Sequence, residues 1–197
     1  MPHSIPWNLT VTSEPAAVFA ADDLKVHSRI DEDIEDSLLA DYLEAAERQV
    51  ETELAIGLQE QTLVLRLDWF PGRRIRLPRP PLTSVTSITY TDTNGASQTL
   101  ATDQYTVNTF TMPGEIVEAW GKSWPTTRDV PNAVVVTYIT GYAQPEDVPQ
   151  MVRNAILLTA GDLYWNRERS VKQALSELPR YEALLANHRC YWEGEQY

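Results

Sequence analysis

The sequence predicts an α+β fold in which an antiparallel β-meander is inserted between helical segments. Apolar residues recur every three or four positions before Gly57 and again after Pro145, which is the period of a helix with one buried face. Between residues 62 and 139 they alternate with polar residues, as in a strand. Turns divide this stretch at intervals of roughly eight to twelve residues, too short for the helical crossovers that parallel strands need. The turns are Pro71-Gly72, Asn94-Gly95, Pro113-Gly114 and Gly141.

The N-terminal part predicts an arm and two helices. Residues 1–19 are polar, contain several prolines and lack periodicity, so we expect an arm that becomes ordered only where something holds it. Residues 20–27 predict a short helix, and a longer acidic helix should follow and end near Gly57. Asp31 or Asp33 can cap its start. The predicted buried stripe of the longer helix is Ile34, Leu38, Tyr42, Ala45, Ala46, Val50 and Leu54.

The middle region predicts seven strands, at residues 62–68, 73–77, 84–91, 97–101, 104–109, 115–120 and 133–139. The second of them leads into the segment Pro78-Arg79-Pro80-Pro81. Proline cannot donate a hydrogen bond to a sheet, so this segment should lie where one strand stops and the next begins.

Helical periodicity returns after Pro145. A proline followed by Glu146 and Asp147 suits the first turn of a helix, so we expect the helix to start there. The apolar positions of this helix are Val152, Ala155, Ile156, Thr159, Ala160, Leu163 and Tyr164. A last helical segment at residues 179–189 precedes an acidic, aromatic tail at residues 190–197. One side of that segment carries Tyr181, Leu184 and Leu185.

The net charge of −12 is unevenly distributed along the chain. Only Arg48 opposes the acids between residues 31 and 60, whereas Asp68 alone opposes the arginines between residues 66 and 79. Opposite charges on two surfaces suit self-association, because complementary potentials align partners. A solvated helix face beside a basic strand explains the same pattern, and both interpretations stay open. Sequence-specific DNA binding is not expected of a chain this acidic.

Composition argues against a membrane protein, a secreted protein and an enzyme. No apolar run approaches the roughly 18 to 20 residues that span a bilayer, and the N-terminus lacks a secretory signal. The sole cysteine, Cys190, excludes an internal disulfide. Gly121-Lys122-Ser123 looks like the end of a phosphate-binding loop, but Ile116 stands where the first glycine is required. No metal site, cofactor or catalytic base is expected around the histidines, which are His3, His27 and His188.

Five features in a fixed order resemble one family. An acidic amphipathic helix precedes residues 77–90 (LPRPPLTSVTSITY), and Gly141-Tyr142 precedes residues 148–158 (VPQMVRNAILL) and 163–168 (LYWNRE). This order is similar to that of the head-tail connector (adaptor) family of tailed phages and gene transfer agents. The resemblance covers roughly residues 20–190.

The resemblance implies a non-enzymatic subunit of a ring, usually of twelve copies in the family, at the head-tail interface of a virion or virion-like particle. It also implies that the subunit is made in the host cytoplasm. The portal protein would lie on one side of the ring and a stopper or tail-terminator protein on the other, and double-stranded DNA would pass through the lumen. The implied connector domain, residues 20–189, is a helical core (residues 20–57 and 146–189) with the β region (residues 62–139) inserted.

Three surfaces follow as hypotheses. The chain after Pro179 would dock on the portal through Tyr191, Trp192 and Tyr197. A basic surface would meet the acidic helix of an adjacent subunit through Arg73, Arg74, Arg76 and Arg79. A competing hypothesis places the same acidic helix at the lumen. The lumen surface would then comprise Asp33, Asp41, Glu44 and Glu51.

An alternative is a protein- or carbohydrate-binding β module that exposes Trp69, Trp120 and Trp124. Such a function requires the indole rings to be exposed, whereas tryptophans in strands are more often buried.

Overall fold

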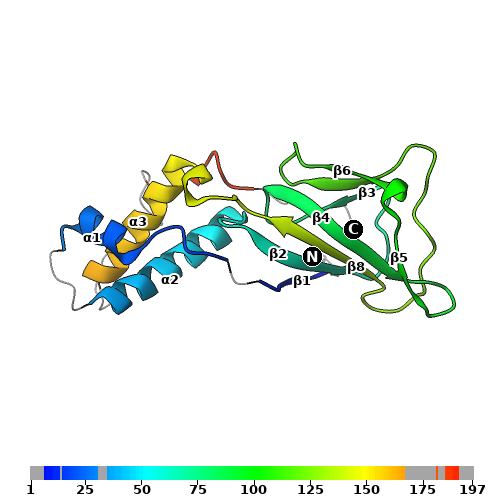
Figure 1. Cartoon of the computed structure of the whole chain (residues 1–197), viewed down its shortest axis with the longest axis horizontal. Helices are drawn as coiled ribbons and strands as arrows, with labels where there is room; N and C mark the ends of the chain where they lie inside the picture. The colour runs from blue at the N-terminus through cyan, green and yellow to red at the C-terminus, as the bar shows by residue number, and fades with distance from the viewer. Residues whose placement is uncertain (1–6, 14, 31–34, 167–180, 182–184, 191–197) are drawn as a thin grey trace, which may run out of the picture. The chain divides into compact units, whose positions relative to one another are not determined.

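A computed structural model describes residues 7–13, 15–30, 35–166, 181 and 185–190 (Figure 1). These residues form two compact units. The β unit takes its described residues from the stretches 1–15 and 60–141, together with residue 190. The helical unit takes its described residues from the stretches 16–59 and 142–189.

The helical unit contains α1 (Ala21–Ser28), α2 (Asp36–Leu54) and α3 (Gln150–Trp165), which pack on one another. A single turn of 3-10 helix at Pro145–Asp147 precedes α3, so the predicted helix starts later than expected. The core of the unit consists of apolar side chains on the facing sides of the helices. They include Leu24, Leu39, Leu43, Ala46, Val50, Leu54, Val152, Ala155, Ile156 and Ala160.

The stripe predicted for α2 is correct in its second half and rotated in its first. Leu39 and Leu43 are fully buried, whereas Ala45 is exposed and Tyr42 is half-buried. Two leucines bury more apolar surface than a tyrosine and an alanine, which favours this rotation. Tyr42 instead packs edge-on against the ring of Tyr164, at a centroid distance of 6.4 Å.

The end of α2 also differs from the prediction. Ala55, not Gly57, adopts the left-handed conformation, with φ of 54°. The N–H group of Ile56 then bonds the carbonyl of Glu51 at 3.3 Å, which closes the last turn. The side chains of Ile56 and Leu58 are buried just after this turn, so packing ends the helix before the glycine is reached.

Glu47 of α2 holds the chain that leads into α1. One carboxylate oxygen accepts the backbone N–H groups of Val18 at 2.9 Å and Phe19 at 3.1 Å. The ring of Phe19 lies 5.1 Å from the guanidinium carbon of Arg153, a cation–π contact. Burial, with a smaller contribution from the charge of Glu51, raises the pKa of Glu47 from 4.5 to about 7 against the lowering effect of these two hydrogen bonds.

The larger sheet of the β unit has five described strands in the order β1-β2-β8-β4-β5, all antiparallel. They are β1 (Trp7–Val11), β2 (Gln61–Leu67), β8 (Val134–Thr140), β4 (Leu82–Thr91) and β5 (Ser97–Thr99). Strand β1 was not predicted, because the polar arm shows no period. It is ordered because β2 holds it, with Asn8 opposite Arg66 in the register.

The smaller sheet has three described strands in the order β3-β7-β6. They are β3 (Arg74–Arg76), β7 (Glu115–Glu118) and β6 (Tyr105–Asn108), with a 3-10 turn at Thr102–Gln104 before β6. The α+β class with antiparallel strands is confirmed. The strand order is not that of a simple meander, because β8 inserts between β2 and β4 and three strands form a separate sheet.

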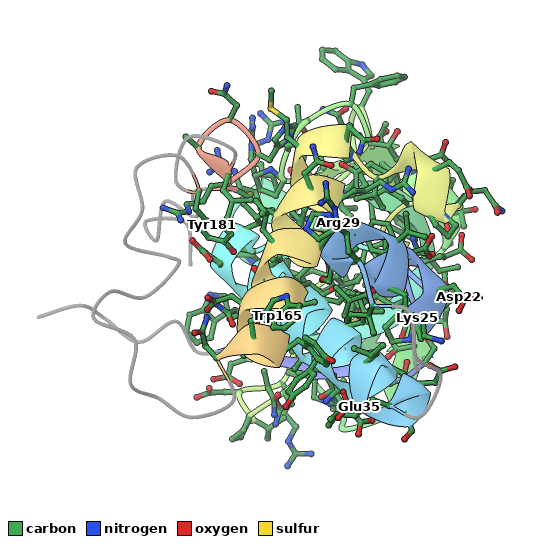
Figure 2. All side chains as sticks on the ribbon, turned by 90° about the vertical axis from the view of Figure 1, so that its left-hand side faces the viewer. Asp22, Lys25, Arg29, Glu35, Trp165 and Tyr181 are labelled. Atoms are coloured by element: carbon green, nitrogen blue, oxygen red, sulfur yellow. The ribbon has the colours of Figure 1, made fainter. Side chains whose placement is uncertain are left out.

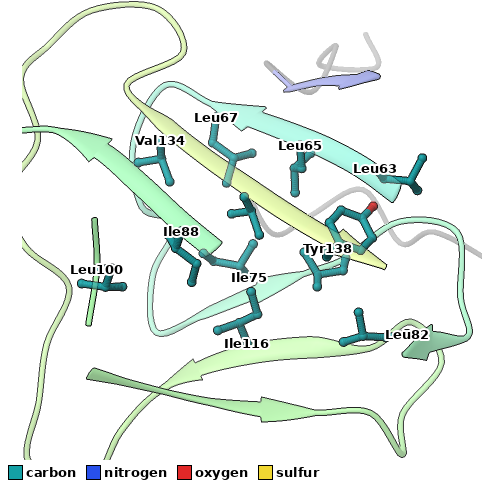
Figure 3. Close-up of a cluster of buried hydrophobic side chains, with 12 residues drawn as sticks. Leu63, Leu65, Leu67, Ile75, Leu82, Ile88, Leu100, Ile116, Val134 and Tyr138 are labelled. Atoms are coloured by element: carbon teal, nitrogen blue, oxygen red, sulfur yellow. The ribbon is translucent and has the colours of Figure 1, made fainter. Parts of the chain in front are cut away.

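One hydrophobic core joins the two sheets of the β unit (Figure 3). The larger sheet contributes Leu65, Ile88 and Val136, and the smaller sheet contributes Ile75 and Ile116. All five side chains are at most 1% exposed. The alternating burial along β2 and β8 explains why the period of two was so clear in the sequence.

The proline-rich segment is the crossover between the sheets, from β3 to β4. Its carbonyls accept hydrogen bonds from buried side chains of β8: the Tyr138 hydroxyl donates to Pro78 at 2.9 Å, and the Thr140 hydroxyl donates to Pro81 at 2.8 Å. The Thr140 hydroxyl also contacts the carbonyl of Arg79. The carbonyl of Pro81 accepts the N–H of Gly141 at 2.9 Å as well. The prediction that this segment lies between two strands is confirmed.

We expect Gly114→Ala to destabilise the β unit. A Cβ atom at Gly114 would lie 2.4 Å from Cβ of Leu82, at the first residue of β4. Overpacking of this kind costs about 1–3 kcal/mol, measurable as a lower free energy of unfolding in urea. The control is Gly161→Ala in α3, where the new Cβ meets nothing closer than 3.5 Å and the helix gains propensity. Equal effects of the two substitutions would contradict the close approach.

We expect Glu47→Gln to flatten the pH dependence of stability. Because the folded state raises the pKa of Glu47 from 4.5 to about 7, its stabilising contribution is full below pH 4.5 and is lost as pH rises through about 7. Glutamine keeps an oxygen to accept both N–H groups and does not titrate. The variant should therefore be more stable than the parent above pH 7, as measured by urea unfolding across this range.

The matched control for that experiment is Glu44→Gln, one turn away on α2 with its side chain 58% exposed. It should leave most of the pH dependence in place. An unchanged slope in Glu47→Gln, with the control behaving as expected, would show that the Glu47 carboxyl does not carry the effect.

Candidate interaction surfaces

The structure brings the predicted arginines to the edge strand of the smaller sheet, where two of them have partners within the chain. Nε of Arg73 lies 3.3 Å from Glu118, and Nη1 of Arg74 lies 3.1 Å from Glu115. The Arg73 side chain is 86% exposed, whereas that of Glu118 is only 12% exposed. These pairs therefore bury the carboxylates and turn the positive charge outward.

Arg76 and Arg79 are half-buried and have interactions of their own. Arg76 belongs to β3, while Arg79 lies in the crossover with a φ of 57°. The four arginines thus share one region of the β unit, but Arg73 and Arg74 are the most exposed of them. Their contact with an adjacent subunit stays a prediction.

The predicted acidic surface of α2 divides into two parts. Asp41 and Glu44 are exposed, and Glu44 forms an ion pair with Arg48 one turn later. Glu51 is half-buried and accepts the N–H of Leu58 at 3.2 Å, so it serves the end of the helix. Asp33 lies outside the described residues.

Sequence reasoning missed the role of the other α2 carboxylates. In the sequence, Glu47 is one of the many acids between residues 31 and 60, and only its burial distinguishes it. Glu53 pairs with Arg189 at 2.9 Å and accepts a hydrogen bond from the Tyr181 hydroxyl at 3.4 Å. One indication of this contact was present in the sequence, because Tyr181 and Leu185 were predicted on the same side of the last helical segment. Both residues are buried.

Polar contacts also fix the end of the helical unit shown in Figure 2. Lys25 of α1 forms ion pairs with Asp36 at the start of α2 and, at 3.7 Å, with Asp22. The Tyr164 hydroxyl of α3 donates to Glu35 at 2.9 Å. The proposed portal-docking residues Tyr191, Trp192 and Tyr197 lie outside the described residues.

The tryptophans of the β unit differ in exposure. Trp120 is 100% exposed and Trp69 is 51% exposed, whereas Trp124 is half-buried and stacks on Phe70 at 5.1 Å. The turn between β6 and β7 also exposes Phe110. The two exposed tryptophans are the residues on which the alternative of a binding module depends.

Other kinds of site find little support in the described part of the chain. There, no three His, Cys, Asp or Glu side chains gather as metal ligands do. Burial raises the pKa of the Cys190 thiol, which disfavours the nucleophilic thiolate. None of the described helices has the length and apolar character needed to cross a bilayer.

Comparison with solved structures shows similar folds over almost the whole chain. A chain from the neck of an empty GTA (gene transfer agent) particle, computed with C6 symmetry, is 23% identical with a TM-score of 0.77; the match covers 94% of this chain and 96% of that one. A chain from the virion of a native GTA particle is 21% identical with a TM-score of 0.76, covering 93% and 96%. A third, from the neck of a native GTA particle computed with C12 symmetry, is 23% identical with a TM-score of 0.69, covering 93% and 96%.

Comparison with curated protein sequences gives no match. The family model of phage gp6-like head-tail connector proteins matches residues 21–119, which is half of the chain and extends from α1 through β7. The chain belongs to the phage gp6-like head-tail connector family.

Proposed function

We propose that this protein is one subunit of a ring at the head-tail interface of a phage or gene transfer agent. Its family membership carries the proposal, because that family is defined by head-tail connectors. Similar chains occur in particle necks computed with C6 and C12 symmetry, which supports a cyclic assembly. The subunit acts by binding other proteins and performs no catalysis.

In this proposal the ring binds the portal protein on one side and a stopper or tail-terminator protein on the other. Double-stranded DNA passes through its lumen without sequence readout. The exposed carboxylates Asp41 and Glu44 suit a lumen, since like charge keeps a duplex from adhering to the wall. Asp33 and Glu51 complete the acidic set that we assign as candidates for this surface.

The contact between copies is a competing use of the same acidic helix. The guanidinium groups of Arg73 and Arg74 face solvent, so an adjacent subunit can reach them even though each already has a carboxylate partner. Arg76 and Arg79 extend the same basic region. A guanidinium group carries several N–H donors, so each arginine can bind a carboxylate of an adjacent copy and keep its partner within the chain.

We expect the double substitution Arg73→Glu and Arg74→Glu to weaken ring assembly. Charge reversal places carboxylates against the acidic helix of the adjacent copy, and the effect should be largest at low salt. Ring formation is measured by mass photometry, and urea unfolding checks that the β unit still folds. Arg128→Glu, at an exposed arginine elsewhere in the β unit, is the control. Unchanged assembly of the double variant at low salt would contradict the contact.

We assign portal docking to Tyr191, Trp192 and Tyr197. The segment before them is anchored on the helical unit by buried Tyr181 and Leu185 and by the Arg189–Glu53 ion pair. A tail that starts from a fixed base loses less freedom on binding than a long free one, and aromatic residues often carry most of the binding energy.

Deletion of residues 191–197 should reduce recruitment to portal-bearing capsids by at least about thirtyfold, the loss that corresponds to one hot spot of about 2 kcal/mol. Recruitment is measured by co-sedimentation with capsids that lack this subunit. The control changes Glu193 and Glu195 to glutamine and keeps the aromatic residues. If the truncated chain sediments with capsids as fully as the parent, the docking assignment is wrong.

A further inference from the structure

The fully exposed Trp120 is the centre of a surface feature that we call the tryptophan corner. The corner comprises Trp120 and the Phe70–Trp124 pair. Phe70 stacks on Trp124 with the rings 5.1 Å apart and 7° from parallel. The stack therefore joins the segment after β2 to the segment that carries Trp120.

The turn that carries Trp120 is firmly held. Ala119 donates its N–H to the carbonyl of Gln104 at 3.0 Å, and Lys122 donates its N–H to Ala119 at 3.0 Å. The N–H of Trp124 bonds the Glu118 carboxylate at 3.0 Å. A fixed turn that presents a fully exposed indole is already ordered for binding, so little freedom is lost when a partner covers it.

Outward positive charge borders the corner. Arg73 pairs with Glu118, the same carboxylate that holds the turn, and the arginine is by far the more exposed partner. Arg74 pairs in the same way with Glu115, and its side chain is 51% exposed whereas that of Glu115 is 13% exposed. An aromatic centre with cations beside it favours a partner that is acidic.

We propose that the tryptophan corner is the apolar centre of the contact between neighbouring copies of this chain, and that it is covered by the acidic face of α2 of the next copy. This inference rests on the proposed ring. Such a contact joins two different surfaces of one chain, the head-to-tail arrangement from which rings are built. Of the two competing uses of α2, lumen and contact between copies, the exposed face that carries Asp41 then serves the second.

The exposed face of α2 complements the corner in charge. Asp41 lies on it as a potential partner for Arg73, while Glu44 beside it pairs with Arg48 within the helix. Ala45, which follows Glu44, is exposed and leaves room for an indole ring to approach the helix. Desolvation of a large aromatic side chain against this surface supplies the apolar part of the contact.

The test is cross-linking in assembled particles, with Cys190→Ser as the background so that no native thiol competes. One copy carries Trp120→Cys and the other Ala45→Cys, and particles are assembled from an equal mixture. A short bismaleimide should link the two kinds of copy into dimers and fail to do so in particles that contain either kind alone. The control replaces Ala45→Cys by Val26→Cys, at an 82% exposed position of α1.

The possible results separate this inference from the proposed function. Incorporation of both copies with no Trp120–Ala45 product overturns the inference and leaves the ring intact. Linking of Trp120→Cys to Phe110→Cys instead would also overturn it, because the β6–β7 turn would then be the occupant. Absence of the chain from particles would contradict the proposed function itself.

A second variant keeps the proposal testable if cysteine disturbs the corner. Trp120→Ala should lower the association between copies by at least about tenfold, and Trp120→Phe should recover part of the loss. Trp120 is fully exposed, so neither change should alter the free energy of unfolding. Association unchanged in Trp120→Ala would count against the corner as the centre of the contact.

Discussion

The β unit depends on how the carbonyls of its proline-rich crossover are satisfied. A segment with three prolines in four residues cannot join a sheet by donating hydrogen bonds, so its acceptors must find donors elsewhere. Tyr138 and Thr140, both buried on β8, provide them. This joins the central strand of the larger sheet to the chain that leaves the smaller one, and it places Leu82 against Gly114 at the start of β4.

The surfaces proposed for the β unit begin next to this crossover. Strand β3 ends just before the crossover, and it carries the arginines whose carboxylate partners lie on β7. Glu118 of β7 then holds the turn of Trp120. The basic edge and the tryptophan corner therefore share one carboxylate, Glu118, which pairs with Arg73 and holds the turn of Trp120.

In the helical unit, a buried carboxylate satisfies backbone N–H groups. The carboxylate of Glu47 loses solvation and accepts hydrogen bonds from two backbone N–H groups. This burial raises its pKa to about 7. Two other carboxylates of α2 have different roles. Glu51 accepts the N–H of Leu58 just after the helix, and Glu53 pairs with Arg189 of the C-terminal segment. What looks in the sequence like a uniform acidic face is functionally divided.

Periodicity predicted most of the secondary structure, because strands such as β2 and β8 alternate strictly between buried and half-buried positions. It could not predict strand order, which is set by the long-range pairing of β8 with β2 and β4. It also missed β1, whose order comes from its partner strand, and the rotation of α2 toward Leu39 and Leu43. The arginine pairs and the burial of Glu47 likewise arise only from tertiary contacts.

The central claim is that this chain occupies the neck of a particle, between capsid and tail. Electron microscopy of assembled particles, with the chain labelled at its N-terminus, tests it most directly. We predict a closed ring of density beneath the portal into which the two units can be fitted. Label found only on the tail tip or capsid shell, or particles with complete necks that lack the chain, would contradict the account.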